Sequence, residues 1–196
     1  MLLGLDVGGT FTDAVIIDGH RVVATAKRRT TKDNLMNGIG EALDAVLEGY
    51  DASNIEQVTL STTVVTNTIV EEKEQVVDLY VVTGPGRNVD DIFPVKPIYL
   101  QGYTDHRGIV VEHTPADAVR GIANMVQARS GTDLAAVSAK FGVRNPQEEL
   151  SITEELKNTY HTISNGSLLS GSLNFPRRTI SAYFNSAVTP VFTVDR

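Results

Sequence analysis

The chain has 196 residues, enough for one large domain or two small ones with a real hydrophobic core. Its net charge of −7 and pI of about 5.0 argue against nucleic acid and membrane surfaces as partners, because phosphate-dominated binding needs clustered lysine and arginine. The sequence has no cysteine, which excludes disulfide bonds, thiolate metal sites and cysteine nucleophiles.

The first half of the chain predicts elements in the order β-β-β-α-β-α. Short runs of Leu, Val and Ile separated by turn residues predict three antiparallel strands. Apolar residues at helical spacing then predict a helix with Asp33 as its N-cap. The predicted strands are 2–7, 14–18, 21–29 and 57–61, and the predicted helices are 31–51 and 63–73. This order favours a mixed sheet in which an antiparallel meander lies beside a parallel pair.

The second half alternates strands with helices, so the fold class is α/β. A strongly apolar strand at 76–84 leads into a turn-rich stretch and a hairpin around 106–108. Thr114 and Asn145 are predicted N-caps, each followed by a proline. The other predicted elements are strands at 133–141 and 161–165 and helices at 115–130, 146–160 and 177–192, the last broken near Pro190. The pattern leaves open whether this half extends the first sheet or forms a second layer.

The stretch "DVGGTFTD", residues 6–13, lies between two apolar runs and predicts a site for negatively charged oxygen. Two adjacent glycines, Gly8 and Gly9, permit a tight turn and a close approach to a ligand. The backbone N–H groups of such a turn can bind an anion. The hydroxyl groups of Thr10 and Thr12 can donate to phosphate oxygens. These four residues are therefore candidate cofactor-binding residues.

Two carboxylates flank this turn. Asp6, at the end of the first strand, can hold a divalent cation through water, because Mg²⁺ gives up its water ligands reluctantly. Asp13 adds a second carboxylate, so we expect Asp6 and Asp13 to be catalytic and Asp6 to be the metal residue. The alternative is an ordinary empty hairpin turn. The motif is neither a Walker A loop nor a dinucleotide-binding G-x-G-x-x-G.

A second polar cluster lies where a predicted strand meets a predicted helix, at Thr62, Thr63, Thr66 and Asn67. A helix N-terminus can bind an anion or a carbonyl oxygen, so Thr63 and Asn67 are candidate substrate-binding residues. The alternative is a polar N-cap cluster. Lys140, at the end of a buried strand, can reach a phosphate or can simply be a solvated strand end.

Four blocks of the sequence follow one another as in one known protein family. They read "DVGGTFTDAVIID", "LSTTVVTNTIVEEK", "VSAKFGVRNPQEEL" and "RRTISAYFNSAVTPVF", and they cover nearly the whole chain. The chain resembles the N-terminal region of the hydantoinase A/oxoprolinase family, in the actin-like ATPase superfamily. The resemblance implies half of an actin-like (ribonuclease H-like) fold, a mixed sheet with helices on both faces. Asp6, Gly8, Gly9 and Thr10 match the superfamily's first phosphate motif.

The resemblance also implies an ATP-dependent hydrolase that opens cyclic amides such as hydantoins and 5-oxoproline. ATP and Mg²⁺ are the expected cofactors of the complete protein, and a C-terminal ATPase lobe and a B-type subunit are the expected partners. Residues 1–196 would be the N-terminal domain, with sub-units 1–75 and 76–196 and without the second lobe. Superfamily ATP sites lie between two domains, so we expect the isolated chain to be inactive and to bind nucleotide weakly.

The sequence departs from the family pattern in two places. Ser61 stands where the family usually has glycine before two threonines, and the segment after "VVTGPGRNVDDIF" lacks the usual "GFRD" and "RP". The substrate can therefore differ from a hydantoin. Two other functions stay open: a small-molecule, sugar-type kinase of the same superfamily, and a non-catalytic subunit of a larger hydrolase or carboxylase complex. A cytoplasmic location is expected, since no apolar run approaches the ~20 residues of a membrane helix.

Overall fold

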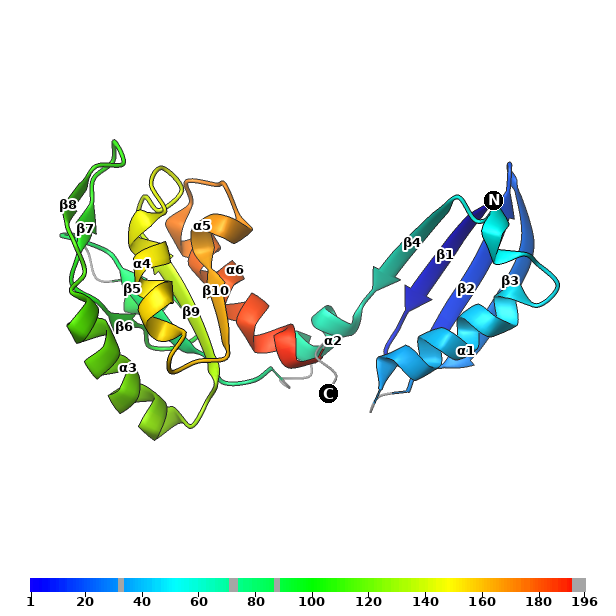
Figure 1. The fold of residues 1–196 in the computed structure, drawn as a ribbon, viewed down its shortest axis with the longest axis horizontal. Coiled ribbons are helices and arrows are strands. Elements are labelled where there is room, and N and C mark those ends of the chain that lie inside the picture. Colours follow the sequence, from blue (N-terminus) through cyan, green and yellow to red (C-terminus); the bar gives the residue numbers. More distant parts are fainter. Residues whose placement is uncertain (32–33, 71–73, 87–88, 192–196) are drawn as a thin grey trace. The chain divides into compact units, whose positions relative to one another are not determined.

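The computed structural model describes residues 1–31, 34–70, 74–86 and 89–191, which form two compact units (Figure 1). Unit 1 comprises the described residues of Met1–Lys73, and unit 2 comprises those of Glu74–Thr193. Both units combine strands with helices, so the predicted α/β class is confirmed. Among the described residues, no helix has the length and apolar character needed to cross a membrane.

Unit 1 contains a four-stranded sheet with the order β3-β2-β1-β4. β1 (Leu2–Val7), β2 (Phe11–Asp18) and β3 (Arg21–Arg29) form an antiparallel meander. β4 (Gln57–Thr62) pairs in parallel with β1. The predicted meander beside a parallel pair is therefore confirmed.

One face of this sheet forms the core of unit 1. Side chains alternate between the two faces of a strand, so Leu3 and Leu5 of β1 point to the same side as Ala14 and Ile16 of β2. Helix α1 (Leu35–Leu47) covers these four buried side chains. The opposite face carries Asp6 of β1 and Asp13 of β2.

Helix α1 follows a polar capping residue. The side chain of Asn34 accepts a hydrogen bond from the N–H of Met36 and caps α1. Asp33, the predicted cap, lies outside the described residues. The 3₁₀ helix η1 (Ala52–Asn54) precedes β4, and α2 (Val64–Val70) follows it. The predicted continuation of α2 to residue 73 also lies outside the described residues.

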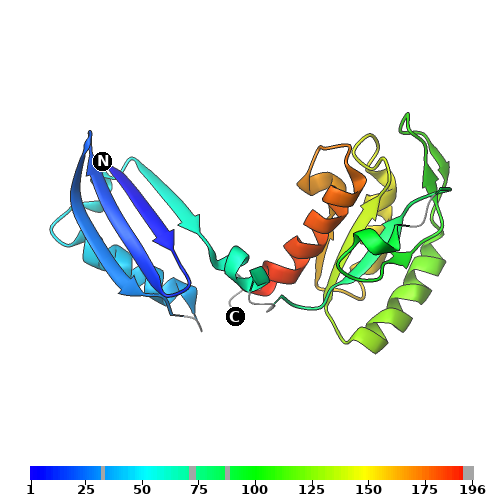
Figure 2. The same cartoon turned by 180° about the vertical axis from the view of Figure 1, so that it is seen from behind.

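Unit 2 contains a separate, fully parallel sheet with the order β10-β9-β5-β6. Its strands are β5 (Asp78–Val82), β6 (Ile98–Tyr99), β9 (Leu134–Ala139) and β10 (Thr162–Asn165). Every residue of β5 and β9 is buried, because helices cover both faces (Figure 1 and Figure 2). Helices α3 (Ala116–Ser130) and α4 (Gln147–Leu156) pack on one face, and α6 (Phe175–Val188) packs on the other.

Short elements complete unit 2. They are the hairpin strands β7 (Tyr103–Thr104) and β8 (Val110–Glu112), the short helix α5 (Gly166–Leu169), and the 3₁₀ helices η2 (Asp90–Ile92) and η3 (Thr189–Val191). η3 follows α6 directly and contains Pro190, so α6 ends close to the predicted break near Pro190.

Two predicted caps of unit 2 have different outcomes. The side chain of Asn145 accepts a hydrogen bond from the N–H of Gln147, the first residue of α4, although the N-cap position itself is occupied by Pro146. The prediction for Thr114 is wrong, because its hydroxyl donates to the carbonyl oxygen of Gln101. α3 instead begins after Pro115 without a side-chain cap.

Candidate functional site

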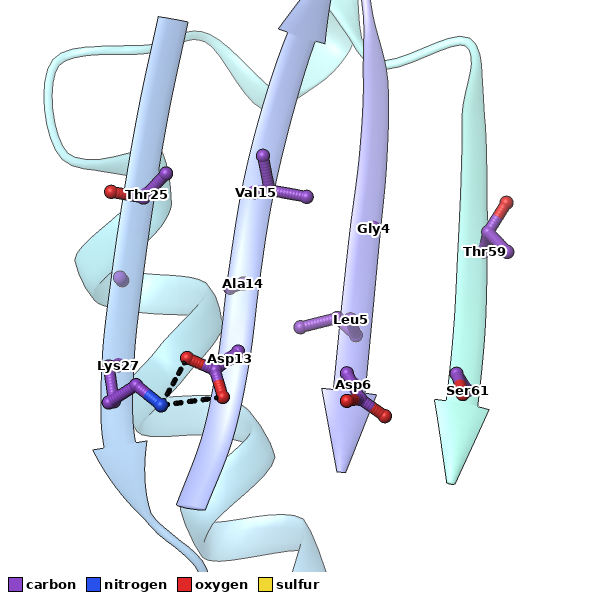
Figure 3. Close-up of a pocket in the computed structure, with 11 residues that line it drawn as sticks. Gly4, Leu5, Asp6, Asp13, Ala14, Val15, Thr25, Lys27, Thr59 and Ser61 are labelled. Atoms are coloured by element: carbon purple, nitrogen blue, oxygen red, sulfur yellow. Dashed lines mark hydrogen bonds and ion pairs between the residues drawn. The ribbon is translucent and has the colours of Figure 1, made fainter. Parts of the chain in front are cut away.

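The face of unit 1 opposite α1 carries an open groove of about 530 Å³ (Figure 3). Strand pairing places a row of four polar residues across it. Asp6 of β1 lies opposite Asp13 of β2, and Asp13 lies opposite Lys27 of β3. On its other side Asp6 neighbours Ser61 of β4. The predicted pair of carboxylates is therefore brought together on one face of the sheet.

The two carboxylates of the row have different surroundings. Nζ of Lys27 lies 2.8 Å from Oδ1 and 2.9 Å from Oδ2 of Asp13 (Figure 3). The same Nζ lies 5.0 Å from the ring centroid of Phe11. Asp6 is exposed, and no hydrogen bond or ion pair of its carboxylate is found among the described residues. The negative charge of Asp13 is balanced, whereas that of Asp6 is available to a cation.

The glycine turn between β1 and β2 closes through its own backbone. The N–H of Gly8 donates to the carbonyl oxygen of Phe11 at 3.0 Å, and a Cβ atom at Gly8 would stand 3.0 Å from the same oxygen. Gly8 is therefore needed for close packing, not for a left-handed backbone. Its N–H is occupied, so the prediction that it binds phosphate is not supported. For the N–H groups of Gly9 and Thr10, no hydrogen bond is found among the described residues.

Thr12 does not face the groove. Its side chain is fully buried, and its Oγ1 lies 3.1 Å from Oγ1 of Thr30. Thr30 donates its own hydroxyl proton to the carbonyl oxygen of Gly8 at 2.8 Å, and its N–H donates to the carbonyl oxygen of Thr10 at 3.0 Å. The predicted phosphate contact of Thr12 is therefore corrected: Thr12 and Thr30 support the turn from inside. The side chain of Thr10 is exposed.

The start of α2 lies beside the same turn. The carbonyl oxygen of Val7 accepts hydrogen bonds from the N–H of Thr63 and from the hydroxyl of Thr62, both at 3.2 Å. Thr63 is exposed next to the site. Asn67 lies within α2, and its side chain is outside the described part of the structure.

The oxygen atoms of the groove suit a hard cation that is shared with a ligand. Among the described residues, no group of three or more histidine, aspartate or glutamate side chains could hold a metal ion. Asp6 and Ser61 are neighbours in the row and offer only oxygen. Mg²⁺ commonly takes one or two carboxylates together with water and the phosphates of a substrate. The residues therefore fit Mg²⁺ that arrives with a phosphate group.

Sequence reasoning did not find the roles of Lys27 and Thr30. Lys27 lies near the end of β3 and Thr30 directly follows this strand, and their position beside the turn depends on how β3 pairs with β2. The available signal was the alternation of β3, in which Thr25 and Lys27 share one face of the strand.

Residues 2–160 match the hydantoinase/oxoprolinase N-terminal region. Two solved structures are similar to the chain. Nucleotide-free acetone carboxylase, an ATP-dependent enzyme, is 18% identical with a TM-score of 0.75, over 97% of this chain and 32% of that protein. The ATP-dependent caprolactamase from Pseudomonas jessenii is 19% identical with a TM-score of 0.65, over 98% of this chain and 32% of that protein. No curated protein matches the chain by sequence.

At this level of identity, the two structures show a shared fold. The chain spans 32% of the length of each of them. The predicted mixed sheet is present in unit 1, whereas the actin-like ATPase superfamily stays a prediction. Because the family match extends over residues 2–160, the chain belongs to the hydantoinase/oxoprolinase family and contains its N-terminal region.

Proposed function

We propose that this chain is the phosphate-binding half of an ATP-dependent hydrolase that opens cyclic amides. Its family and the fold that it shares with two ATP-dependent proteins support this function. The observation that carries the proposal is the exposed carboxylate of Asp6. It stands without a partner among the described residues, at the end of β1 and beside the glycine turn.

Each residue of the site has a separate role in this proposal. Asp6 holds Mg²⁺ through water, and Ser61 offers a hydroxyl next to it. The N–H groups of Gly9 and Thr10, with the hydroxyl of Thr10, contact the terminal phosphates. When bound, ATP supplies a phosphoryl group that activates the amide oxygen of the substrate, and Mg²⁺ neutralises phosphate charge.

Asp13 acts as a positioning residue, because both of its oxygens contact Nζ of Lys27. Lys27 thereby balances the charge of Asp13 at the groove, which lowers the repulsion of an anionic ligand. On the substrate side, Thr63 is a proposed contact because it is exposed beside the turn. Asn67, in the same helix, is retained as the second proposed contact.

Further parts of the site come from outside this region in our proposal. The two similar proteins are about three times as long as the part that this chain matches, since it covers 32% of each. We therefore propose that a second ATPase lobe closes over the nucleotide and that a B-type subunit binds the complete protein. The 196-residue chain alone then binds ATP weakly.

The test uses the complete protein with its partner subunit. Asp6→Asn should lower the rate of ATP hydrolysis by at least ~100-fold, since the loss of one charged contact to the transition state typically costs ~3 kcal/mol. Asp18→Asn, at the other end of β2, removes the same charge far from the turn and should leave the rate unchanged. An Asp6→Asn variant with the wild-type rate would contradict the proposal.

Substrate identity is tested on the same protein. Hydantoin, 5-oxoproline and caprolactam are offered with ATP, and ring-opened product is measured together with ADP. We expect one cyclic amide to raise ADP release and to give a matching amount of opened product. Phosphorylation of a sugar without any ring opening would favour a kinase instead.

A further inference from the structure

The carboxyl ends of β5 and β9 in unit 2 form a topological switch point. From β5 the chain continues to β6 on one side, and from β9 it continues to β10 on the other. The connection after β5 packs with α6, whereas α4, after β9, packs on the opposite face. In open α/β sheets, ligands bind outside the carboxyl ends of the strands at such a point.

The loop after β5 presents unused backbone donors at this point. Gly84 and Gly86 have positive φ values of 63° and 147°. A Cβ atom at Gly84 would overlap the ring of Tyr103. Glycine is therefore required there both for the left-handed backbone and for the space beside the ring. Among the described residues, no hydrogen bond is found from the N–H of either glycine.

Lys140 brings a positive charge from the end of β9 to the same loop. Its N–H donates to the carbonyl oxygen of Val82 at 2.8 Å, which joins the ends of the two strands. Its Nζ lies 3.7 Å from the place where a Cβ atom at Gly86 would stand. No ion pair of Lys140 is found among the described residues, and its ammonium lies 5.5 Å from the ring centroid of Phe141.

Two fully buried charged side chains fix the residue before Lys140. Oε1 of Glu149 accepts a hydrogen bond from the N–H of Ala139 at 2.8 Å, and Nη2 of Arg178 donates to the carbonyl oxygen of Ala139 at 3.0 Å. Burying charges is costly even when they are paired, so apolar packing would hold a strand end more cheaply. Here the two charged side chains instead hold the N–H and the carbonyl group of Ala139, in the two peptide groups that flank its Cα.

Backbone strain occurs at the same strand end. Phe141 has a φ of 65°, a left-handed conformation that non-glycine residues rarely adopt. Nε of Arg178 is buried without a hydrogen-bond partner in the described structure. Such strain is concentrated at functional sites. Together with the buried charges, it indicates that the position of Lys140 is specified for more than packing.

A groove beside the glycine loop leaves room for a ligand. It measures about 420 Å³, and its lining includes Thr83, Gly84, Pro85, Tyr99 and Tyr103. Glu112 lies in the same groove, where its carboxylate accepts a hydrogen bond from Gln101. The groove therefore has aromatic walls and a negative charge that already has a partner.

We propose that unit 2 contains a second ligand site, which binds the oxyanion of a small organic molecule between the loop 83–86 and Lys140. The N–H groups of Gly84 and Gly86 and the ammonium of Lys140 contact the oxyanion, which is a carboxylate or a phosphate. The body of the molecule lies in the groove beside Tyr99 and Tyr103. This site is separate from the Asp6 groove and does not depend on the proposed function.

The experiment is an amide NMR titration of the 196-residue chain with sodium phosphate and, separately, with sodium acetate. One or both salts should shift the amide signals of Gly84 and Gly86, while sodium chloride at equal ionic strength should not. A response to phosphate alone indicates a phosphorylated ligand, and a response to acetate alone indicates a carboxylate. Either response supports the site.

Variants test the role of the ammonium. Lys140→Ala should weaken the binding about tenfold, as expected for the loss of a charge-assisted contact, and Lys140→Arg should retain it. Lys157→Ala removes an equal charge that is paired with Glu154, and Asp6→Asn alters only the other groove; both should bind like the wild type. The proposal would be overturned if neither salt shifted the amide signals of Gly84 and Gly86. Equal binding by Lys140→Ala and the wild type would also overturn it.

Discussion

Nζ of Lys27 contacts both carboxylate oxygens of Asp13, at 2.8 Å and 2.9 Å, whereas the Asp6 carboxylate, next in the row, has no partner among the described residues. Two aspartates that look alike in the sequence therefore differ in charge balance. The pair Asp13–Lys27 is electrically neutral, and Asp6 carries the remaining negative charge. The groove therefore contains the carboxylate of Asp6, unpaired in the described part of the chain, and the ammonium group of Lys27, which is paired with Asp13.

Removal of Lys27 should affect nucleotide binding more than stability. In Lys27→Met the charge of Asp13 is unbalanced beside Asp6, and an added charge about 5 Å away in a water-exposed groove contributes about 1 kcal/mol. The KM of the complete protein for ATP should rise about fivefold with a smaller change in kcat. The free energy of unfolding should change by less than ~1 kcal/mol, because both side chains are about half exposed.

The double variant Asp13→Asn with Lys27→Met is the control for this prediction. It removes both charges of the pair and should return the KM toward the wild-type value. Steady-state kinetics at two salt concentrations would measure the effect. A KM that is the same in all three proteins would show that the pair does not act on the nucleotide.

Substitutions of Thr30 and of Thr10 should have different effects on the free energy of unfolding. Thr30→Val leaves the carbonyl oxygen of Gly8 and the buried hydroxyl of Thr12 without their partner, which should cost about 1–3 kcal/mol. Thr10→Val changes an exposed side chain and should stay within ~0.5 kcal/mol. Urea denaturation of the chain measures both, and equal stabilities would contradict the supporting role of Thr30.

Gly142→Ala should destabilise unit 2. The added methyl group would overlap Oε1 of Glu149, which cannot move freely because it accepts a hydrogen bond from Ala139. We expect a loss of about 1–3 kcal/mol in the free energy of unfolding. Gly121→Ala in α3 is the matched control, since no atom lies within 4 Å of the new methyl group and alanine favours a helix by about 0.5–1 kcal/mol. A Gly142→Ala protein as stable as the control would show that the site around Glu149 can relax.

Unit 2 should lose stability at alkaline pH. Burial raises the pKa of Tyr80 from 10.0 to about 12, and burial also raises the pKa of Tyr160, whose hydroxyl donates to Asp78 at 2.8 Å. Between pH 10 and pH 12 the folded chain therefore binds more protons than the unfolded chain, so the free energy of unfolding falls as the pH rises. Below pH 10 this contribution is fully present.

Tyr80→Phe tests the alkaline prediction, because it removes one of the titrating hydroxyls. Its urea midpoint should fall less steeply than that of the wild type as the pH is raised through this range. Tyrosinate absorbance, followed in parallel, should show Tyr80 ionising late or together with unfolding. Identical slopes for the two proteins would contradict the assignment to Tyr80.

Local patterns in the sequence were sufficient for most of the elements. The short apolar run at 2–7 predicted the first strand, and Gly131, with a φ of 66°, ends α3 where the pattern placed the stop. Thr114 failed as a cap because its hydroxyl contacts Gln101, thirteen residues away. Such a tertiary contact leaves no local signal.

The site could be predicted only in part. Asp6 followed from its place between a strand and a glycine turn. Lys27 did not, because a bulge between Ile16 and Ile17 shifts the pairing of β2 with β3 by one residue and thereby brings Lys27 opposite Asp13. A one-residue shift exchanges the two faces of a strand. For Thr12, the alternation with Ala14 and Ile16 did contain the signal for burial, but the predicted strand began too late to include it.

The two hydrogen bonds that Thr30 donates to the carbonyl groups of Gly8 and Thr10 have a thermodynamic consequence. They restrict the turn before any ligand arrives, so little conformational entropy remains to be lost when an anion is captured there. Recognition at this place is then limited by desolvation of the ligand and of Asp6, and not by ordering of the peptide.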